Sequence, residues 1–153
     1  MRDFEKISFD QFKKDVAEDI NLYNAYELPQ RDSNSTAGYD IYLLQDLIIE
    51  PNEIKKIPTG IKSFFEKDEV LFIIVRSSTG FKYNIRLCNQ VGVIDADYYN
   101  NQNNEGHIWL KIQNEGKEKV IIPQGEAIVQ GIFLKYLTTQ SDKDKNIERT
   151  SDY

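Results

Sequence analysis

The stretch Val70-Leu71-Phe72-Ile73-Ile74-Val75 is apolar at every position. Successive side chains of a β-strand point to opposite faces, so a strand of this composition is predicted to be covered on both faces. A second stretch, residues 127–134, is apolar on both faces except at Gln130. A polar side chain in such a strand needs hydrogen-bond partners, so Gln130 is either a satisfied polar group of the core or a ligand contact.

Short β-rich segments separated by turns extend in both directions from these two strands. Pro51, Pro58 and Pro123 each stand second in a turn-like tetrad, the position that a turn favours for proline. The predicted strands are residues 41–44, 47–49, 54–57, 61–65, 70–75, 84–87, 92–94, 108–113, 119–122 and 127–136. Because strands and helices do not alternate along the chain, this pattern favours an all-β sandwich or jelly-roll fold.

The two ends of the chain differ from this β-rich body. Ser8-Phe9-Asp10-Gln11 fits a capping box, and apolar residues at helical spacing follow it, so a short surface helix is predicted over residues 9–19. It is interpreted as a packing element without chemistry, within an N-terminal extension of residues 1–21. Residues 141–153 are polar and charged without periodicity, which predicts a mobile tail after a single domain of residues 1–140.

The composition of the chain indicates which partners it can bind and in which compartment it is expected. The chain has 153 residues and a net charge of −6, which argues against a nucleic-acid surface but allows a local arginine to hold an anion. Cys88 is the only cysteine, which fits a reducing compartment. No apolar run reaches the roughly 18–20 residues of a membrane span, and the start of the chain lacks the apolar segment of a signal peptide. We therefore expect a cytoplasmic protein without membrane contact.

Two polar groups could carry chemistry. Asp95 ends an apolar run and precedes Tyr98 by three residues, and Arg76-Ser77-Ser78 directly follows the apolar strand. A carboxylate that activates water, an aromatic wall and a cluster of phosphate donors together suggest a small anionic substrate. Taken singly, each has a more common structural explanation: a turn for Asp95, core packing for Tyr98 and an ion pair for Arg76.

His107 is the only histidine. It lies on the face opposite to the apolar side chains of residues 108, 110 and 112, so it is expected to face solvent or an interface rather than to catalyse. One histidine and one cysteine leave no His–Cys zinc site, and nothing supports a Ser-His-Asp triad.

Four segments, in order and spacing, resemble the homotrimeric dUTPase family over about residues 28–136. They are Ala37-Gly38-Tyr39-Asp40, Arg76-Ser77-Ser78, residues 89–98 with Asn89, Gly92, Asp95 and Tyr98 in register, and residues 125–133 with Gln130. The resemblance implies a distorted jelly roll, of the dUTPase-like β-clip type, in a homotrimer whose sites are each built from several subunits.

The resemblance also implies a reaction: dUTP and water give dUMP and pyrophosphate, which limits uracil in DNA. Magnesium would be the cofactor, held through the triphosphate and water rather than by direct protein ligands. Asp95 would activate the water that attacks the α-phosphorus. Arg76, Ser77, Ser78 and Gln130 would hold phosphate oxygens, and Asp40 would support the magnesium waters or a neighbouring basic group.

The same resemblance assigns the recognition of the nucleoside. Asn89, with backbone around Gly92 to Tyr98, would read the uracil edge, and cytosine would leave buried groups unpaired. Tyr98 would pack on the deoxyribose and leave no room for a 2′-hydroxyl. Arg149 resembles the family arginine that reaches the terminal phosphate.

The sequence departs from the family at its C-terminal end. The family's fifth motif, a glycine-rich segment containing phenylalanine that closes over the nucleotide, is not found in this sequence. We therefore expect a normal nucleotide pocket with reduced catalysis. Val75 stands where many members have proline, the loop at residues 100–105 is longer than usual, and the N-terminal helix is additional.

Two other functions compete with that of a diphosphatase. A dCTP deaminase shares the fold, but it needs a glutamate on the strand after the third motif, and residues 106–113 contain none. A trimer that senses the nucleotide or docks to a protein such as a repressor would suit the missing fifth motif and the added loop and helix. Asp95 argues against this second alternative, since a pure binder needs no catalytic base.

Overall fold

The computed structural model describes residues 1–142 and 149–151. Its helices are α1 (Phe9–Asp15), α2 (Ile20–Ala25), α3 (Ser77–Tyr83) and the 3-10 helix η1 (Ala96–Tyr98). Its strands are β1 (Asp3–Lys6), β2 (Tyr39–Tyr42), β3 (Leu47–Ile49), β4 (Ile54–Pro58), β5 (Ile61–Phe64), β6 (Glu69–Val75), β7 (Ile85–Leu87), β8 (Gly92–Asp95), β9 (Trp109–Asn114), β10 (Val120–Ile122) and β11 (Ala127–Lys135). No helix in this part of the chain is long and apolar enough to cross a membrane.

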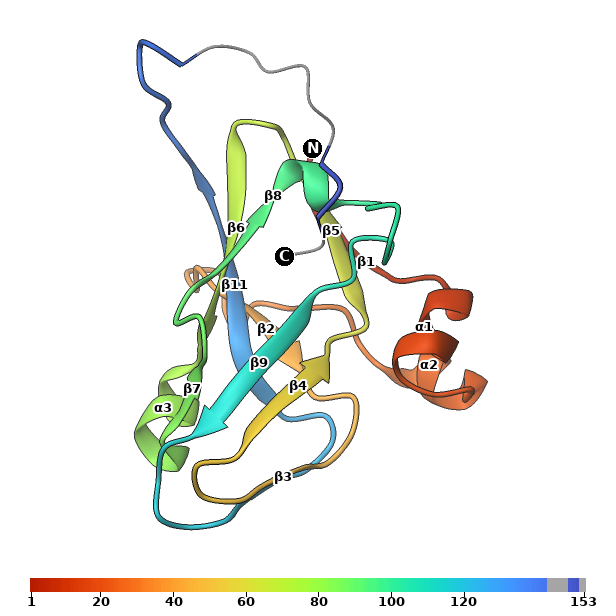
Figure 1. Cartoon of the computed structure of the whole chain (residues 1–153), viewed down its shortest axis with the longest axis vertical. Helices are drawn as coiled ribbons and strands as arrows, with labels where there is room; N and C mark the ends of the chain where they lie inside the picture. The colour runs from red at the N-terminus through yellow and green to blue at the C-terminus, as the bar shows by residue number, and fades with distance from the viewer. Residues whose placement is uncertain (143–148, 152–153) are drawn as a thin grey trace.

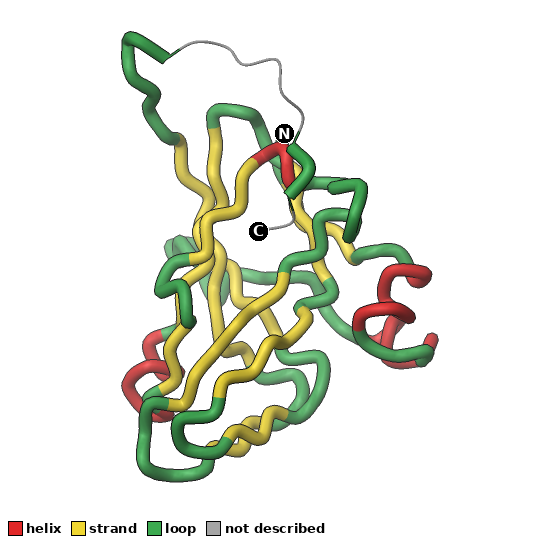
Figure 2. The backbone as a smooth tube through the Cα atoms, viewed as in Figure 1, coloured by secondary structure: helices red, strands yellow, loops and turns green. Residues whose placement is uncertain are grey.

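The strands form small antiparallel sheets rather than one large sheet (Figures 1 and 2). The largest has the order β2-β11-β6-β8, and a three-stranded sheet has the order β4-β9-β7. β1 pairs with β5, and β10 pairs with β3. Strands that are neighbours in these sheets are often distant in the sequence, and the arrangement confirms the predicted all-β jelly-roll class.

The sheets enclose one main apolar core. Leu71 and Ile73 of β6 are at most 2% exposed, whereas Phe72 and Ile74 on the other face of the strand are only partly buried. β6 was predicted to be covered on both faces. Within a single chain the face of Leu71 and Ile73 is covered, and the face of Phe72 and Ile74 is covered only in part. Fully buried residues from other strands complete the core: Ile49, Ile61, Ile112, Ile128 and Val129.

The strand predictions agree with the structure to within two residues at each end, but other elements differ. The first helix ends at Asp15 rather than at residue 19, because the backbone of Val16 leaves helical geometry, with φ −122° and ψ −75°. α2 begins separately after its N-cap Asp19, whose carboxylate accepts from the Leu22 amide at 3.1 Å. β1 and α3 had no strong local signal. They depend on tertiary contacts, such as the Thr79 hydroxyl that donates to the Ile128 carbonyl at 2.7 Å.

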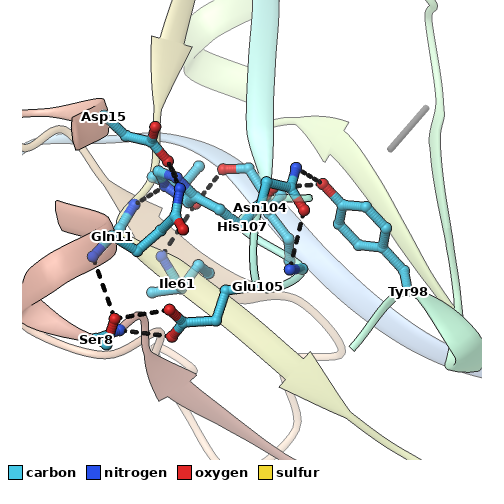
Figure 3. Close-up of polar contacts among 12 residues, drawn as sticks. Ser8, Gln11, Asp15, Ile61, Tyr98, Asn104, Glu105 and His107 are labelled. Atoms are coloured by element: carbon cyan, nitrogen blue, oxygen red, sulfur yellow. Dashed lines mark hydrogen bonds and ion pairs between the residues drawn. The ribbon is translucent and has the colours of Figure 1, made fainter. Parts of the chain in front are cut away.

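The expectation that His107 faces solvent or an interface is wrong, because its side chain is fully buried. The prediction assumed that side chains alternate between two faces of a strand. His107 instead precedes the first residue of β9, and Asp15 of α1 contacts its side chain (Figure 3). Its Nδ1 lies 2.6 Å from the Asp15 carboxylate, and its Nε2 accepts from the Gly60 amide at 2.8 Å. Burial lowers the pKa of His107, although Asp15 opposes that shift.

We predict that acidification destabilises the chain through His107. The charged groups that act on the imidazole are Asp15, Glu105 and Lys56, and burial outweighs the two carboxylates. Because the unfolded chain takes up this proton near pH ~6.5 and the folded chain resists it, the free energy of unfolding should fall as the pH drops below about 6.5. Thermal unfolding followed by circular dichroism between about pH 8 and pH 5 measures the effect. His107→Gln serves as the comparison, and an identical pH dependence in both proteins would contradict the prediction.

Candidate active site

A largely apolar cavity of about 820 Å³ lies beside β8 and η1. This volume lies within the roughly 300–1,000 Å³ of typical small-molecule sites. Five of the predicted site residues line it, namely Asn89, Gly92, Asp95, Tyr98 and Arg149. The structure therefore brings these five residues together at one cavity.

Gly92 lets β8 lie close against β6 at the cavity wall. It pairs with Ile73 in the register of the two strands, and a Cβ at this position would lie 3.1 Å from the Ile73 Cβ. Contacts of 3.0–3.4 Å are tighter than most real Cβ contacts. A side chain at position 92 would therefore press on Ile73.

Asp95 is the last residue of β8 and the N-cap residue of η1, but its carboxylate makes no capping hydrogen bond. The side chain of Asp95 therefore does not stabilise the turn through a capping hydrogen bond. Instead, it pairs with the Arg149 guanidinium at 3.1 Å, and Asp97 pairs with the same group at 3.2 Å. The Asp95 side chain is 54% exposed, so water can reach it.

Tyr98 forms a buried wall of the same cavity and is 6% exposed. Its hydroxyl donates to the His107 carbonyl at 2.6 Å and accepts from the Asn104 amide at 2.7 Å. The Arg149 guanidinium lies over the ring, 5.5 Å from its centre. The ring is therefore fixed at its hydroxyl end and presents a face toward the cavity.

Arg149 belongs to a short described segment that lies against the loop after η1. The side-chain amide of Asn101 donates to the Ser151 carbonyl at 3.0 Å, and that of Asn103 donates to the Thr150 carbonyl at 2.8 Å. These contacts bring Arg149 to the cavity from more than 50 residues away in the sequence. The rest of the predicted mobile tail, residues 143–148 and 152–153, lies outside the described residues.

A second group of predicted residues lies where β2, β11 and β6 run side by side. Gln130 pairs in register with Asp40, and Arg76 contacts the Asp40 carboxylate at 3.0 Å. A weaker contact of 3.5 Å joins Arg76 to Asp32. Burial raises the pKa of Asp40, and Arg76 opposes this shift. Ser77 and Ser78, the first residues of α3, are exposed directly beyond Arg76.

Gly38 explains how Gln130 fits into this group. A Cβ on Gly38 would lie 2.0 Å from the Gln130 Oε1, so no larger residue leaves room for the amide. The Gln130 amide also donates to the Val75 carbonyl at 3.5 Å. The sequence left open whether Gln130 is a core group or a ligand contact, and its half-buried position beside Arg76 is compatible with ligand contact.

The two groups lie at opposite ends of β6 and do not meet within one chain. Asp95 pairs with Val70 at the start of the strand, whereas Arg76 directly follows its last residue, Val75. At about 3.3 Å per residue, six residues correspond to roughly 20 Å. Within a single chain the predicted site residues therefore form two separate groups, and the resemblance implied that each site is built from several subunits.

The sequence did not identify several side chains of the cavity wall. Trp109, Lys56 and Cys88 line it, and Lys56 lies 4.7 Å from the centre of the Trp109 ring. None of them stands in a recognisable motif. The pairing of β4 with β9 brings Lys56 near Trp109, and the Cys88 amide donates to the Lys111 carbonyl of β9 at 2.8 Å. The presence of the chain's one tryptophan beside Tyr98 had no signal in the local sequence.

Comparisons with known proteins point to one family. The sequence model of the dUTPase family matches residues 24–153. The deoxyuridine 5'-triphosphate nucleotidohydrolase of Lactococcus lactis is 43% identical over 121 residues, which are 79% of this chain and 81% of that protein. The corresponding protein of Desulfitobacterium hafniense is 38% identical over 128 residues, with 78% and 81% covered.

Solved structures agree with this match. The dUTPase from Streptococcus mutans is 38% identical and superposes with a TM-score of 0.73, covering 90% of this chain and 98% of that one. A mutant dUTPase from phage phi11 of S. aureus, described as coordinating a structural Mg(II) ion, has a TM-score of 0.68 at 17% identity, with 97% and 99% covered. At that identity the second likeness concerns the fold alone.

We predict that Gly92→Ala destabilises the chain by about 1–3 kcal/mol, because the new methyl group presses on Ile73. Gly80→Ala is a matched control, since the nearest atom to its Cβ would be 3.9 Å away. In a helix this control should be neutral or stabilising by up to about 1 kcal/mol. Chemical denaturation of both variants measures the difference, and equal stabilities would show that the contact with Ile73 is not restrictive.

Proposed function

Because this chain belongs to the dUTPase family, we infer that it is a dUTP diphosphatase, which converts dUTP and water to dUMP and pyrophosphate. The observation that carries this inference is the position of Asp95. Its accessible carboxylate lies at the edge of a nucleoside-sized cavity, makes no capping bond, and faces an arginine suited to phosphate.

Asp95 is proposed as the general base. Its carboxylate would take a proton from a water molecule as the water oxygen forms a bond to the α-phosphorus. The bond from that phosphorus to the bridging oxygen would break, and pyrophosphate would leave with the electron pair. Arg149 pairs with both Asp95 and Asp97. We propose that a bound triphosphate competes for this guanidinium and leaves Asp95 free to accept the proton.

Arg76, Ser77, Ser78 and Gln130 are proposed to hold phosphate oxygens and to stabilise the charge that develops on pyrophosphate. The exposure of the two serines and the half-buried position of Arg76 support this role, because all three can reach a ligand. Asp40 would keep the Arg76 guanidinium oriented through the contact of 3.0 Å.

Magnesium is proposed to arrive with the triphosphate. Among the described residues no three His, Cys, Asp or Glu side chains form a cluster suited to a metal ion. The carboxylates beside Arg76, those of Asp40 and Asp32, are the hard oxygen donors that magnesium prefers, and Asp40 would face the waters of the ion. The ion would neutralise charge on the phosphates.

Recognition of the nucleoside is assigned to the cavity. Asn89, with the backbone from Gly92 onward, would bind the uracil edge, and an amino group at the same place, as in cytosine, would leave buried acceptors and donors unmatched. Tyr98 would pack on the deoxyribose with its ring face and exclude a 2′-hydroxyl. Its fixed hydroxyl and low exposure support a rigid wall at this position.

A complete site is proposed to need more than one copy of the chain. Asp95 and Arg76 are separated by the length of β6, so their joint action on one nucleotide requires that two copies each contribute one group. A homotrimer, as in the family resemblance, satisfies this requirement. We also propose a cytoplasmic location, since the only cysteine, Cys88, is free.

The direct test is pyrophosphate release from dUTP with magnesium, in parallel with dCTP, dTTP and UTP. We expect activity on dUTP at least about 100-fold above that on the others, because each mismatched group leaves buried partners unpaired. Asp95→Asn should lower kcat by about 10²–10⁴-fold through loss of the base, with little change in nucleotide affinity. Equal turnover of dUTP by Asp95→Asn would exclude this carboxylate as the base.

Mixing two inactive variants tests the shared site. Asp95→Asn and Arg76→Ala chains should each be inactive, whereas a mixture unfolded and refolded together should recover activity. If two copies contribute to each site, about a quarter of the sites in an equal mixture receive both intact groups. A mixture that stays as inactive as either variant would indicate that both groups act within one chain.

A further inference from the structure

The segment that precedes the family match, residues 1–23, is attached to the turn that supports Tyr98. Ser8, the N-cap of α1, donates from its amide and hydroxyl to the Glu105 carboxylate, at 2.7 and 2.6 Å (Figure 3). In the predicted capping box Gln11 would have bound the Ser8 amide. Its side chain instead donates to Asp15 at 2.9 Å.

Asp15, the last residue of α1, binds His107 from the other end of the helix. The carboxylate can only accept, so the Nδ1 of His107, 2.6 Å away, carries the proton. Its Nε2 accepts from the Gly60 amide at 2.8 Å, which fixes the same tautomer independently. The imidazole is therefore neutral, fully buried and held at both nitrogens.

The backbone of the same turn holds Tyr98. The His107 carbonyl accepts from the Tyr98 hydroxyl at 2.6 Å, and the Asn104 amide donates to that hydroxyl at 2.7 Å. The turn is tight, because Gly106 has a φ of +81° and a Cβ there would lie 2.5 Å from the Tyr98 carbonyl. A shift of the turn would therefore move the Tyr98 ring.

We propose that Asp15 is a positioning residue for Tyr98, and that α1 sets the discrimination between deoxyribose and ribose through His107. This inference rests on the proposed role of Tyr98 as the wall that packs on the sugar. Asp15 touches neither the cavity nor Tyr98, and acts through the position of the His107 backbone.

A purely structural role for Asp15 in docking α1 is less consistent with the packing. Phe12 is fully buried and contacts the rings of Tyr23 and Tyr26, with centroids 5.2 and 5.7 Å away. Ile7 and Leu44 complete this second apolar cluster. The helix is thus held by apolar contacts, and loss of the Asp15 carboxylate should leave it docked while His107 loses one of its two anchors.

The test compares kcat/KM for dUTP with kcat/KM for UTP in Asp15→Ala. We expect the ratio to fall by roughly tenfold or more, since small misplacements of positioning groups cost up to about 10²-fold. Asp15→Asn keeps an acceptor oxygen and should restore most of the ratio. The matched control is Asp10→Ala on the same helix, whose exposed carboxylate pairs with Lys13 at 3.4 Å, and it should leave the ratio unchanged.

A double-mutant cycle tests whether Asp15 acts through the Tyr98 hydroxyl. In a Tyr98→Phe background the hydroxyl link is gone, so Asp15→Ala should cause no further loss of the ratio. A full additional loss would overturn the proposal. So would a ratio in Asp15→Ala equal to that of the wild-type chain, because the carboxylate would then not affect the sugar wall.

Nuclear magnetic resonance gives a readout that does not require turnover. His107 is the only histidine, so its ring nitrogen signals are unambiguous. We expect the Nδ1-protonated neutral form at pH ~7, a shift of these signals when dUMP is added, and a smaller response in Asp15→Ala. No response to dUMP in the wild-type chain would overturn the proposal. Failure of the wild-type chain to prefer dUTP over UTP would instead contradict the role of Tyr98 itself.

Discussion

The pairing of β6 with two partners is the constraint on which the rest of the structure depends. β6 pairs over its whole length with β11 and over its first part with β8. Ile73, at the middle of the strand, lies opposite Gly131 on one side and Gly92 on the other. The two glycines leave the space that the buried Leu71 and Ile73 side chains occupy, so three strands approach closely around one apolar row.

The same pairing determines where the chemistry lies. Because β8 joins the beginning of β6, Asp95 is placed at one end of the sheet. β11 lies along the whole of β6, and β2 pairs with β11 near the other end, where Gln130 and Asp40 lie beside Arg76. Asp95 and Arg76 are thus held apart by the length of β6. This separation is the physical reason for the proposal that one site is shared between copies of the chain.

The cavity beside β8 also depends on segments far from it in the sequence. Tyr98 is anchored by a turn that α1 holds from the N-terminal side, and Asp95 pairs with Arg149 from the C-terminal side. Both segments lie outside the sheets that form the core (Figure 1). The wall of the cavity is therefore set by polar contacts with the ends of the chain as well as by apolar packing.

The sequence by itself determined the class of fold and the segments of every strand except β1, and it grouped Asp95 with Tyr98. Apolar runs and turn residues act locally, and the residues around Asp95 and Tyr98 are close in the chain, so their grouping could be predicted. Only the tertiary structure decided the burial of His107, the role of Glu105 as partner of the Ser8 cap, and the distance between Asp95 and Arg76. These features arise from contacts between residues some 25 to 97 positions apart or from the register of paired strands, and no local pattern of side chains encodes either.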